Sequence, residues 1–314
     1  MKKVFLMKKI RNKINGLLLL NKPLGISSND AIQKVKRALN AEKVGHTGTL
    51  DPMATGLLPV CLGEATKFAN FLLDGDKEYI ATAKLGVITD SGDSEGKIVA
   101  TNTVDVSLEE IKSAIKHFTG EIKQIPPMYS ALKFNGKPLY EYAREGIFIE
   151  RPERAITIHE LELIDYSITK EEIIFRAKVS KGTYIRTLAE DIGNYLGCGA
   201  SLTALQRTES YPFKLSDSYN IEQIVEIGDY SRLNILPVDI LCDSLSILEV
   251  NDKQFTLIKN GNQCRIYDCK FADSMMVRLY YQGKFYGVAE IKYQEDRAYI
   301  CPLRMISREE SLIV

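Results

Sequence analysis

Hydrophobic and polar positions alternate with two different periodicities along this chain of 314 residues, and together they predict both strands and helices. Residues 14–20 form an apolar run of strand length, which ends at the turn Asn-Lys-Pro-Leu-Gly of residues 21–25. Ser27 and Asp30 have the spacing of a capping box before an amphipathic helix, and Ser107 and Glu110 have the same spacing before a helix over 107–118. The glycine-rich segment 45–56 lies between these helices, and we expect it to be a loop.

Further strands are predicted in the middle of the chain. Residues 78–87 and 97–100 alternate on either side of an acidic turn at 90–96, a pattern typical of a hairpin with a long loop. Strands are also predicted at 155–165 and 173–180, before a helix that runs through Leu196. This mixture predicts an α+β fold in which antiparallel strands dominate.

The pattern changes near residues 237–243, where short strands with tight turns begin. We therefore expect a separate small β domain from residue 246 to residue 314. A basic extension over 1–13 and a larger domain over 14–240 complete the predicted organisation. The strands expected in the small domain cover residues 250–255, 264–267, 275–281, 285–291 and 297–304.

Composition places the chain among ordinary globular proteins, because 45% of its residues are hydrophobic and 26% are charged. The apolar run near the start is too short to cross a membrane, and it lacks the features of a secretory signal. We therefore expect a cytoplasmic protein without a membrane partner. Six scattered cysteines and three histidines fit neither a zinc site nor a disulfide framework, so no metal is expected.

Charge is distributed unevenly although the formal net charge is zero. Residues 1–50 contain eleven Lys and Arg but only two acidic residues. Such a region favours a focused contact with phosphates over coating of a nucleic acid by bulk charge. A solvated basic tail without a specific role is an equal alternative for residues 2–13.

Asp51 is the first candidate for chemistry. It lies in a loop flanked by glycines, and Pro52 disfavours a helical conformation at the aspartate. Such a loop can present one carboxylate to a cleft. By itself an Asp-Pro pair is a common turn, so the longer string around it must decide between the two interpretations.

That string closely resembles the bacterial tRNA pseudouridine-55 synthase family, the TruB family of pseudouridine synthases. The resemblance rests on Gly45-His46-Thr47-Gly48-Thr49-Leu50-Asp51-Pro52 and its continuation to Pro59. Further matching strings follow in the family's order, at residues 18–25, 63–67, 127–133, 139–144, 180–187 and 197–200.

The resemblance implies a pseudouridine synthase fold with a mixed, mainly antiparallel central sheet flanked by helices and loops. It also implies a small C-terminal β-barrel-like domain of the PUA type that binds RNA. The implied reaction detaches uracil from C1′ of uridine 55 in the T loop of tRNA, turns the ring and reattaches it through carbon. The family uses neither a metal nor an organic cofactor for this isomerisation.

The resemblance also assigns roles to individual residues. Asp51 matches the catalytic carboxylate, and Arg186 matches the arginine that pairs with it and keeps it ionised. Because the uridine is stacked inside the T loop, the enzyme must flip the base out. The substrate-binding positions implied are Tyr79 as the stacking partner of the base, Tyr184 and Leu205 as walls of the pocket, His46 as the residue that fills the vacated space, and Lys22 and Lys67 as phosphate contacts beside the cleft.

The expected partner is tRNA, bound through its T arm and, by the C-terminal domain, on its acceptor-stem side. No obligatory protein partner is expected. Two alternatives remain open: a tRNA-folding chaperone in which catalysis is secondary, and a guide-RNA-type pseudouridine synthase that needs partners. The sequence also leaves open whether Asp51 acts as a nucleophile or as a base at C2′.

Overall fold

The leucine run near the start is buried on both sides as strand β1 (Gly16–Lys22) in the computed structural model, which describes residues 10–307. Side chains of successive strand residues point to opposite faces. Leu18 and Leu20 accordingly pack into one apolar cluster, while Leu17 and Leu19 pack into another. Burial of one leucine side chain contributes about 1.5–3 kcal/mol, so this strand anchors both clusters.

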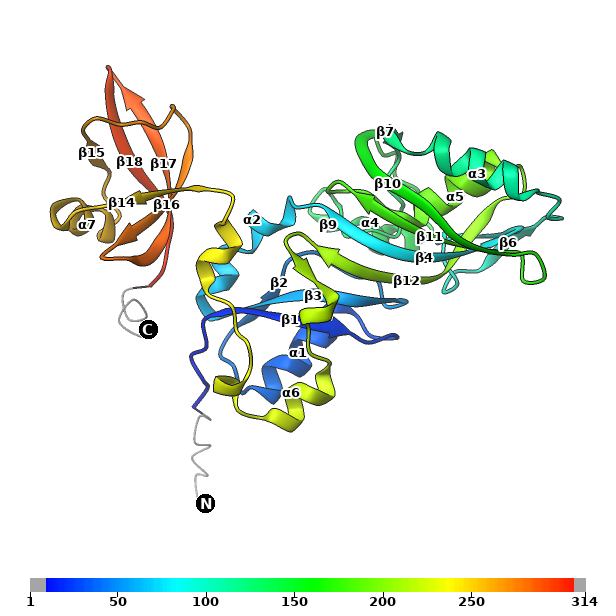
Figure 1. Ribbon diagram of the computed structural model, residues 1–314, viewed down its shortest axis with the longest axis horizontal. Helices are drawn as coiled ribbons and strands as arrows, with labels where there is room; N and C mark the ends of the chain where they lie inside the picture. Colours follow the sequence, from blue (N-terminus) through cyan, green and yellow to red (C-terminus); the bar gives the residue numbers. More distant parts are fainter. Residues whose placement is uncertain (1–9, 308–314) are drawn as a thin grey trace.

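The described residues contain a nine-stranded sheet of order β1-β3-β12-β4-β11-β10-β7, with β13 beside β12 and β2 beside β3 (Figure 1). Only the β12–β3 pairing is parallel, so the predicted mixed, mainly antiparallel sheet is confirmed. The strands not yet given are β2 (Val44–His46), β3 (Ala54–Leu62), β4 (Lys77–Leu85), β7 (Gly120–Gln124), β10 (Arg154–Ser167), β11 (Glu172–Val179), β12 (Ala200–Ser210) and β13 (Phe213–Lys214).

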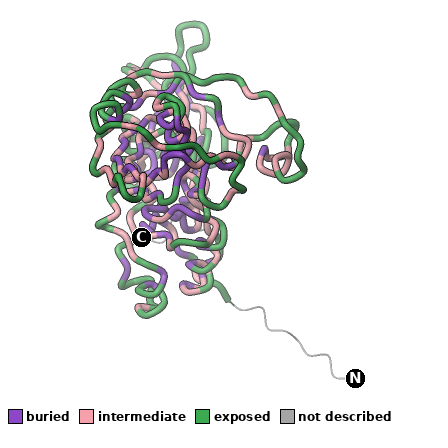
Figure 2. Tube along the Cα trace, turned by 90° about the vertical axis from the view of Figure 1, so that its right-hand side faces the viewer, coloured by how far each residue is buried: buried purple, intermediate pink, exposed green. Residues whose placement is uncertain are grey.

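Helices flank this sheet, and their ends follow the expected caps. The Ser27 hydroxyl accepts a hydrogen bond from Asp30 N, and Ser107 and Glu110 form a complete capping box. The main core lies between the sheet and these helices, and buried residues gather along the middle of the chain trace (Figure 2). The helices of the larger body are α1 (Ser28–Ala38), α2 (Ala69–Leu73), α3 (Leu108–His117), α4 (Leu139–Arg144), α5 (Ile185–Tyr195) and α6 (Ile221–Ile227).

The acidic turn at 90–96 connects a hairpin, but the strand predicted at 78–87 is not its first arm, because most of that strand is β4 of the main sheet. Strand β5 (Val87–Thr89) pairs with β6 (Ile98–Thr101). A second short hairpin, β8 (Lys133–Phe134) with β9 (Lys137–Pro138), precedes α4. The loop predicted over residues 45–56 is shorter, because its two ends belong to β2 and β3.

The C-terminal part of the described chain is a five-stranded sheet of order β14-β16-β17-β18-β15, and the predicted small β architecture is confirmed. The strand predicted at 250–255 is wrong, because a helix α7 (Asp252–Lys259) begins there. Asn251 and Gln254 form a capping box at its start, and this local signal outweighs the β-type residues nearby. The strands are β14 (Ser246–Glu249), β15 (Cys264–Ile266), β16 (Met276–Tyr281), β17 (Lys284–Gln294) and β18 (Arg297–Met305).

The C-terminal sheet packs on the larger body through one of the apolar clusters that include β1. Phe285 and Val288 of β17 belong to the same cluster as Phe68, and the Phe68 and Phe285 rings meet edge to face at 5.4 Å. The 3-10 turn η4 (Val238–Cys242) leads into this contact. The domain limits at 240 and 246 stay a prediction.

The basic extension predicted at 1–13 lies mostly outside the described residues, since these begin at residue 10. Its last part runs beside the end of α1, where Arg11 Nη1 donates to Ala41 O (3.3 Å) and Asn12 Nδ2 donates to Leu39 O (2.8 Å). Over residues 10–307 no helix is both long and apolar enough to span a membrane.

The close approach of β3 and β12 can be tested by a substitution at Gly56. Its φ is +103°, and a Cβ at this position would lie 2.8 Å from Arg207 N and overlap the Arg207 carbonyl oxygen. Gly56→Ala is therefore expected to lower the free energy of unfolding by about 2 kcal/mol or more in urea titrations. Gly136→Ala is the control, because Gly136 also has a positive φ but has open space around it, so an equal loss in both variants would contradict this packing argument.

Candidate active site

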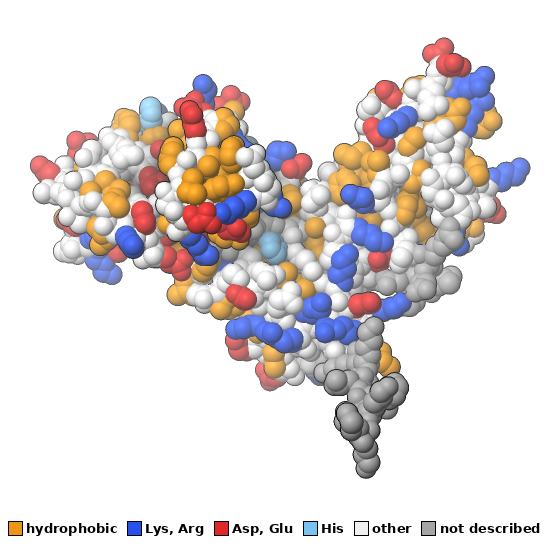
Figure 3. All heavy atoms as spheres, turned by 180° about the vertical axis from the view of Figure 1, so that it is seen from behind, with side chains coloured by type: hydrophobic (Ala, Val, Ile, Leu, Met, Phe, Trp, Pro, Cys, Tyr) orange, Lys and Arg blue, Asp and Glu red, His pale blue; other side chains and the backbone are white. Residues whose placement is uncertain are grey.

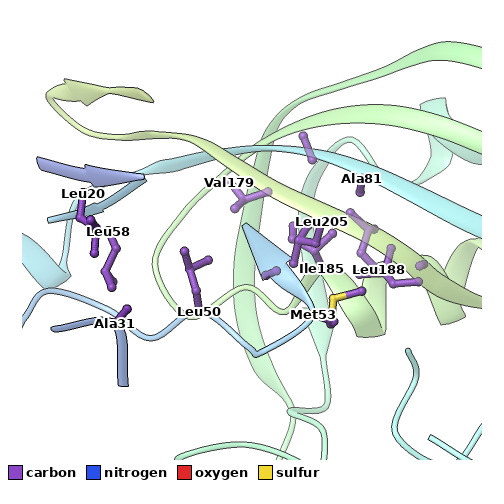
Figure 4. Packing of buried hydrophobic residues seen from close by; sticks show 14 of the residues in the cluster. Leu20, Ala31, Leu50, Met53, Leu58, Ala81, Val179, Ile185, Leu188 and Leu205 are labelled. Atoms are coloured by element: carbon purple, nitrogen blue, oxygen red, sulfur yellow. The ribbon is translucent and has the colours of Figure 1, made fainter. Parts of the chain in front are cut away.

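The loop between β2 and β3 holds Asp51 between two apolar anchors. Leu50 and Met53 are both buried in the main core, and Figure 4 shows both among the core side chains, with Met53 near Leu205 and Ile185. The Ser28 hydroxyl donates to Leu50 O (2.9 Å) and accepts from Leu50 N (2.8 Å). These contacts fix the main chain on both sides of the aspartate.

The Asp51 side chain remains 35% exposed, and it lines a cleft of about 720 Å³. The other walls come from the start of α1, the acidic turn at 90–96, residues 129–131 and α4. His46 and Arg186 line the same cleft, so the structure brings three of the sequence-predicted site residues together. Asp90, Asp93 and Glu95 line the cleft as well. A cleft of this size with a few convergent polar groups is a typical enzyme site.

Arg186 connects the segments around the cleft. Its side chain is only 5% exposed, and its Nε lies 3.1 Å from Asp51 Oδ2. The remaining nitrogens donate to Ser91 O (2.9 Å) and Tyr129 O (2.6 Å), and Nη1 also lies 3.5 Å from Asp93 Oδ2. One guanidinium on α5 therefore holds the loop between β2 and β3, the acidic turn and the segment before β8 in a common arrangement.

Burial raises the pKa of Asp51 above its ordinary value, and the nearby Arg186 opposes this rise. The Asp93 carboxylate also raises the pKa of Asp51, while the Lys22 ammonium lowers it. Burial thus outweighs the pairing that was expected to keep Asp51 ionised. The result is a carboxylate that titrates closer to neutral pH than an exposed aspartate does.

His46 lies at the end of β2, half-buried, with its ring beside the cleft. Its Nδ1 is buried and has no hydrogen-bond partner among residues 10–307. Burial lowers the pKa of His46, and the cation of Arg207 lowers it further. The ring is therefore poised as a neutral group that can accept or donate one further hydrogen bond.

Tyr79, Tyr184 and Leu205 do not line this cleft in the structure. Tyr79 lies on β4 and Leu205 on the neighbouring β12, and both pack against the main core. Tyr184 precedes α5, where Gln124 holds its main chain through a pair of hydrogen bonds. The roles expected for these three residues stay predictions.

The expectation of a phosphate contact for Lys22 is wrong. Lys22 is 0% exposed, and its ammonium donates to Pro23 O (2.9 Å), Ile26 O (2.7 Å) and Pro52 O (3.4 Å). Burial lowers the pKa of Lys22 to about 8, although Asp51 raises it. An enclosed ammonium cannot reach a phosphate, but this one supports the residue that follows Asp51.

Lys67 does not lie beside the cleft as expected. Its side chain is 31% exposed, and Nζ contacts Glu64 Oε2 (2.7 Å) and Met305 O (3.1 Å). It therefore connects the turn η1 (Gly63–Lys67) to the C-terminal sheet. A phosphate contact by Lys67 stays a prediction, at this junction and not at the cleft.

Sequence reasoning missed Asp93 as a site residue. The pattern around the acidic turn indicates only a hairpin loop, and Asp93 reaches Arg186 through a contact between residues far apart in the chain. Asp93 is buried and held locally, because Ser91 Oγ (2.6 Å) and Glu95 N (3.1 Å) both donate to its Oδ1. No local pattern distinguishes such a residue from an ordinary turn aspartate.

Two family models match the chain. The model described as TruB family pseudouridylate synthase (N terminal domain) matches residues 36–185, and that of the tRNA pseudouridylate synthase B C-terminal domain matches residues 186–242. The chain belongs to the TruB family of pseudouridylate synthases. The family expected from the sequence is thus confirmed, and its members are isomerases.

Curated relatives of the family cover almost the whole chain. The tRNA pseudouridine synthase B of Neisseria meningitidis serogroup B is 46% identical over 303 residues, which are 96% of this chain and 97% of the relative. The same-named proteins of Aromatoleum aromaticum and Francisella tularensis subsp. tularensis are 47% and 49% identical, over 95% and 90% of this chain and 94% and 93% of theirs.

Solved structures agree on the fold. A chain from the crystal structure of a Cbf5-Nop10-Gar1 complex has a TM-score of 0.69 at 24% identity, covering 94% of this chain and 86% of that one. A chain from an H/ACA RNP bound to a substrate RNA containing 2′-deoxyuridine has a TM-score of 0.68 at 24% identity, covering 92% and 84%. At this identity the likeness shows the shared fold alone.

Asp93 makes the pH dependence of the site testable. If the ionised form of Asp51 is required, turnover falls as the pH drops through its raised pKa. Asp93→Asn removes an anion that raises this pKa and leaves Arg186 to Asp51, and both effects lower the pKa of Asp51. The acidic limb of kcat/KM against pH is therefore expected to move to lower pH.

The quantity to measure is the pH at the midpoint of the acidic limb, and it is compared between variants even if their maximal kcat/KM values differ. Asp243→Asn is the control, because Asp243 pairs with Arg278 in the C-terminal part and should leave the limb in place. A limb that stays fixed or moves to higher pH in Asp93→Asn would show that the two carboxylates are not coupled in this way.

Proposed function

We propose that this protein isomerises a uridine in the T loop of tRNA, at the position called 55, to pseudouridine, with Asp51 as the catalytic carboxylate. Its curated relatives are named tRNA pseudouridine synthase B and match nearly its full length. The observation that carries the proposal is the contact of 3.1 Å between the cleft carboxylate of Asp51 and the buried guanidinium of Arg186. An aspartate beside the ribose can attack an electrophilic carbon or remove a proton next to the anomeric centre.

Both chemical roles need the same setting. The carboxylate must be ionised, which Arg186 favours. It must also be partly desolvated, because bound water would reduce its reactivity as a nucleophile or base. The 35% exposure of Asp51 leaves one side open to the cleft while the other is held by the protein. The isomerisation balances within one nucleotide: the C1′–N1 bond breaks, the C1′–C5 bond forms, C5 loses its proton and N1 gains one, so no external oxidant or reductant is needed.

The base must leave its stack before Asp51 can reach the sugar, at a cost of a few kcal/mol. His46 is suited to fill the vacated place, since its half-buried ring lies at the cleft and its Nδ1 is without a partner among the described residues. Tyr79 is proposed to stack on the flipped uracil, which contributes about 1–3 kcal/mol for one base. Tyr184 and Leu205 are proposed to complete the pocket after the RNA enters.

Cations outside the cleft are proposed to bind the RNA backbone. Lys34 and Arg37 on α1 and Lys43 before β2 are exposed. Figure 3 shows Lys and Arg side chains gathered along the lower part of the larger body and up toward the C-terminal sheet. The T arm would occupy the cleft, and the C-terminal sheet would contact the acceptor-stem side.

The chaperone alternative uses the same surface, since opening the T loop already disturbs the folded tRNA. It gives no reason for a carboxylate facing an anionic substrate, because such a group repels phosphates. The guide-RNA alternative would rest on a likeness to solved structures at 23–24% identity, which shows the fold alone, whereas curated relatives named tRNA pseudouridine synthase B are 45–49% identical. We therefore assign the tRNA isomerase activity to the single chain.

The direct test of this function is to incubate the purified chain with an unmodified tRNA transcript without additive and to map pseudouridine. Modification confined to the T-loop uridine is expected. Modification elsewhere, or none, would contradict the proposed function.

Asp51→Asn is expected to reduce turnover by about 1000-fold or more, because the amide keeps the shape but loses the charge. Binding of tRNA should change by no more than about threefold, since the side chain makes no attractive contact with phosphates. Single-turnover formation of pseudouridine and filter binding measure the two effects. Asp74→Asn is the control, because Asp74 pairs with Lys181 at the surface; turnover near the parent rate in Asp51→Asn would remove Asp51 from the mechanism.

The proposed RNA contact of the C-terminal sheet is tested by charge removal. Arg265 and Lys270 are exposed, and Arg265 lies 4.6 Å over the ring of Tyr267. The double variant Arg265→Ala, Lys270→Ala is expected to reduce the slope of log affinity against log salt by about 1 for each phosphate that the protein no longer neutralises. Lys112→Ala, Lys116→Ala on α3 is the matched control, and equal slopes in both double variants would exclude this contact.

A further inference from the structure

Arg207 is a buried cation next to the catalytic loop with no assigned role. It lies on β12 and is only 1% exposed, which makes it the largest fully buried side chain among the described residues. It pairs in register with Gly56 of β3 and with Tyr79 of β4. The strand pairing places its side chain on the same face of the sheet as those of Tyr79 and Leu205.

Two nitrogens of the guanidinium donate to main-chain oxygens on either side of Asp51. Nε donates to Leu57 O (2.7 Å) on β3, and Nη2 donates to Gly48 O (3.3 Å), three residues before Asp51. No carboxylate among residues 10–307 lies within ion-pair distance of it. The side chain therefore spans the loop like a clamp.

Stability alone gives little reason for an arginine here. Burying a cation without a carboxylate is costly, and an apolar side chain of similar length would avoid that cost. Other cations lie in its field: the pKa values of Lys22 and Lys77 are lowered to about 8, mainly by burial, and the Arg207 cation contributes to both shifts. An arginine differs from an apolar side chain in geometry, because its planar guanidinium can direct two donors at fixed angles to two carbonyl groups.

We propose that Arg207 is a positioning residue of the reaction, which clamps Gly48 to Leu57 and thereby fixes where the loop places the Asp51 carboxylate and the His46 ring. The inference rests on the proposed function. Gly48 lies between His46 and Asp51, so a shift of its carbonyl moves both side chains. A displacement of about 1 Å at a reacting group can reduce a rate by about 100-fold.

The experiment compares Arg207→Lys with Arg207→Met. Lysine keeps the charge and most of the length, but its single ammonium cannot hold both carbonyl groups in the same geometry. Both variants are expected to reduce kcat by about 100-fold with KM for tRNA changed by less than about threefold. The amides of residues 47–53, apart from Pro52, which has no amide hydrogen, should exchange hydrogen faster in both variants, while those of α3 stay unchanged.

Histidine NMR separates position from charge. Arg207→Met should raise the pKa of His46 because the neighbouring cation is removed, whereas Arg207→Lys should leave it near its parent value. His117, which stacks on Tyr195, provides the internal reference. A purely electrostatic role predicts that Arg207→Lys keeps both the His46 pKa and the turnover, and that result would overturn the clamp.

Arg176→Met is the matched control, because Arg176 lies on the neighbouring strand β11 and is paired with Glu78 and Glu162. An equal loss of kcat in this control, or a loss confined to KM in the Arg207 variants, would also overturn the proposal. If Arg207→Met does not fold, the kcat and the hydrogen exchange of Arg207→Lys alone test the proposal. If the parent protein itself forms no pseudouridine, the proposed function fails, and unchanged exchange of residues 47–53 in Arg207→Lys would independently overturn the clamp.

Discussion

The buried contact between Arg186 and two carboxylates is the interaction on which the site depends. A guanidinium that is 5% exposed loses most of its hydration, and this loss is offset only if its donors find partners with good geometry. Asp51, Asp93 and the carbonyl groups of Ser91 and Tyr129 supply them. Because these partners come from three separate segments, the cleft can form only after the sheet, the β5–β6 hairpin and α5 have come together. Its shape is therefore a consequence of the whole larger body.

The central sheet fixes the position of the loop that carries Asp51, the partner of Arg186. Strand β1 is buried on both faces, and β3 lies between it and β12 in the order of strands. Gly56 allows β3 to approach β12 closely, so the loop before β3 is held over the sheet. Leu50 and Met53 then anchor that loop in the core on either side of Asp51-Pro52. With Leu50 and Met53 buried, the Asp51 carboxylate between them stays at the wall of the cleft.

Much of this was predictable from local signals and from the family resemblance. The caps at Ser27 and Ser107 encode their helices directly, and the resemblance placed Asp51 beside Arg186. Local sequence signals did not predict the structure where the burial of a residue depends on strands that are distant in the sequence. Lys22 has the sequence of a surface lysine in a turn, but the segment around Pro52 encloses it, and the central strand β12 was not predicted at all. The helix α7 was missed because β-type residues surround its cap and favour a strand when the cap is not weighed.

Buried cations that bind main-chain oxygens recur around the loop that holds Asp51, and one electrostatic constraint accounts for them. Lys22 reaches Pro52 O after Asp51, and Arg207 reaches Gly48 O before it. A carboxylate partner at either position would add negative charge beside Asp51 and raise its pKa further, as Asp93 already does. Carbonyl oxygens satisfy the donors without a net negative charge. The loop can thus be held firmly without further negative charge, so that Arg186 and Lys22 still oppose the rise in the pKa of Asp51 that burial causes.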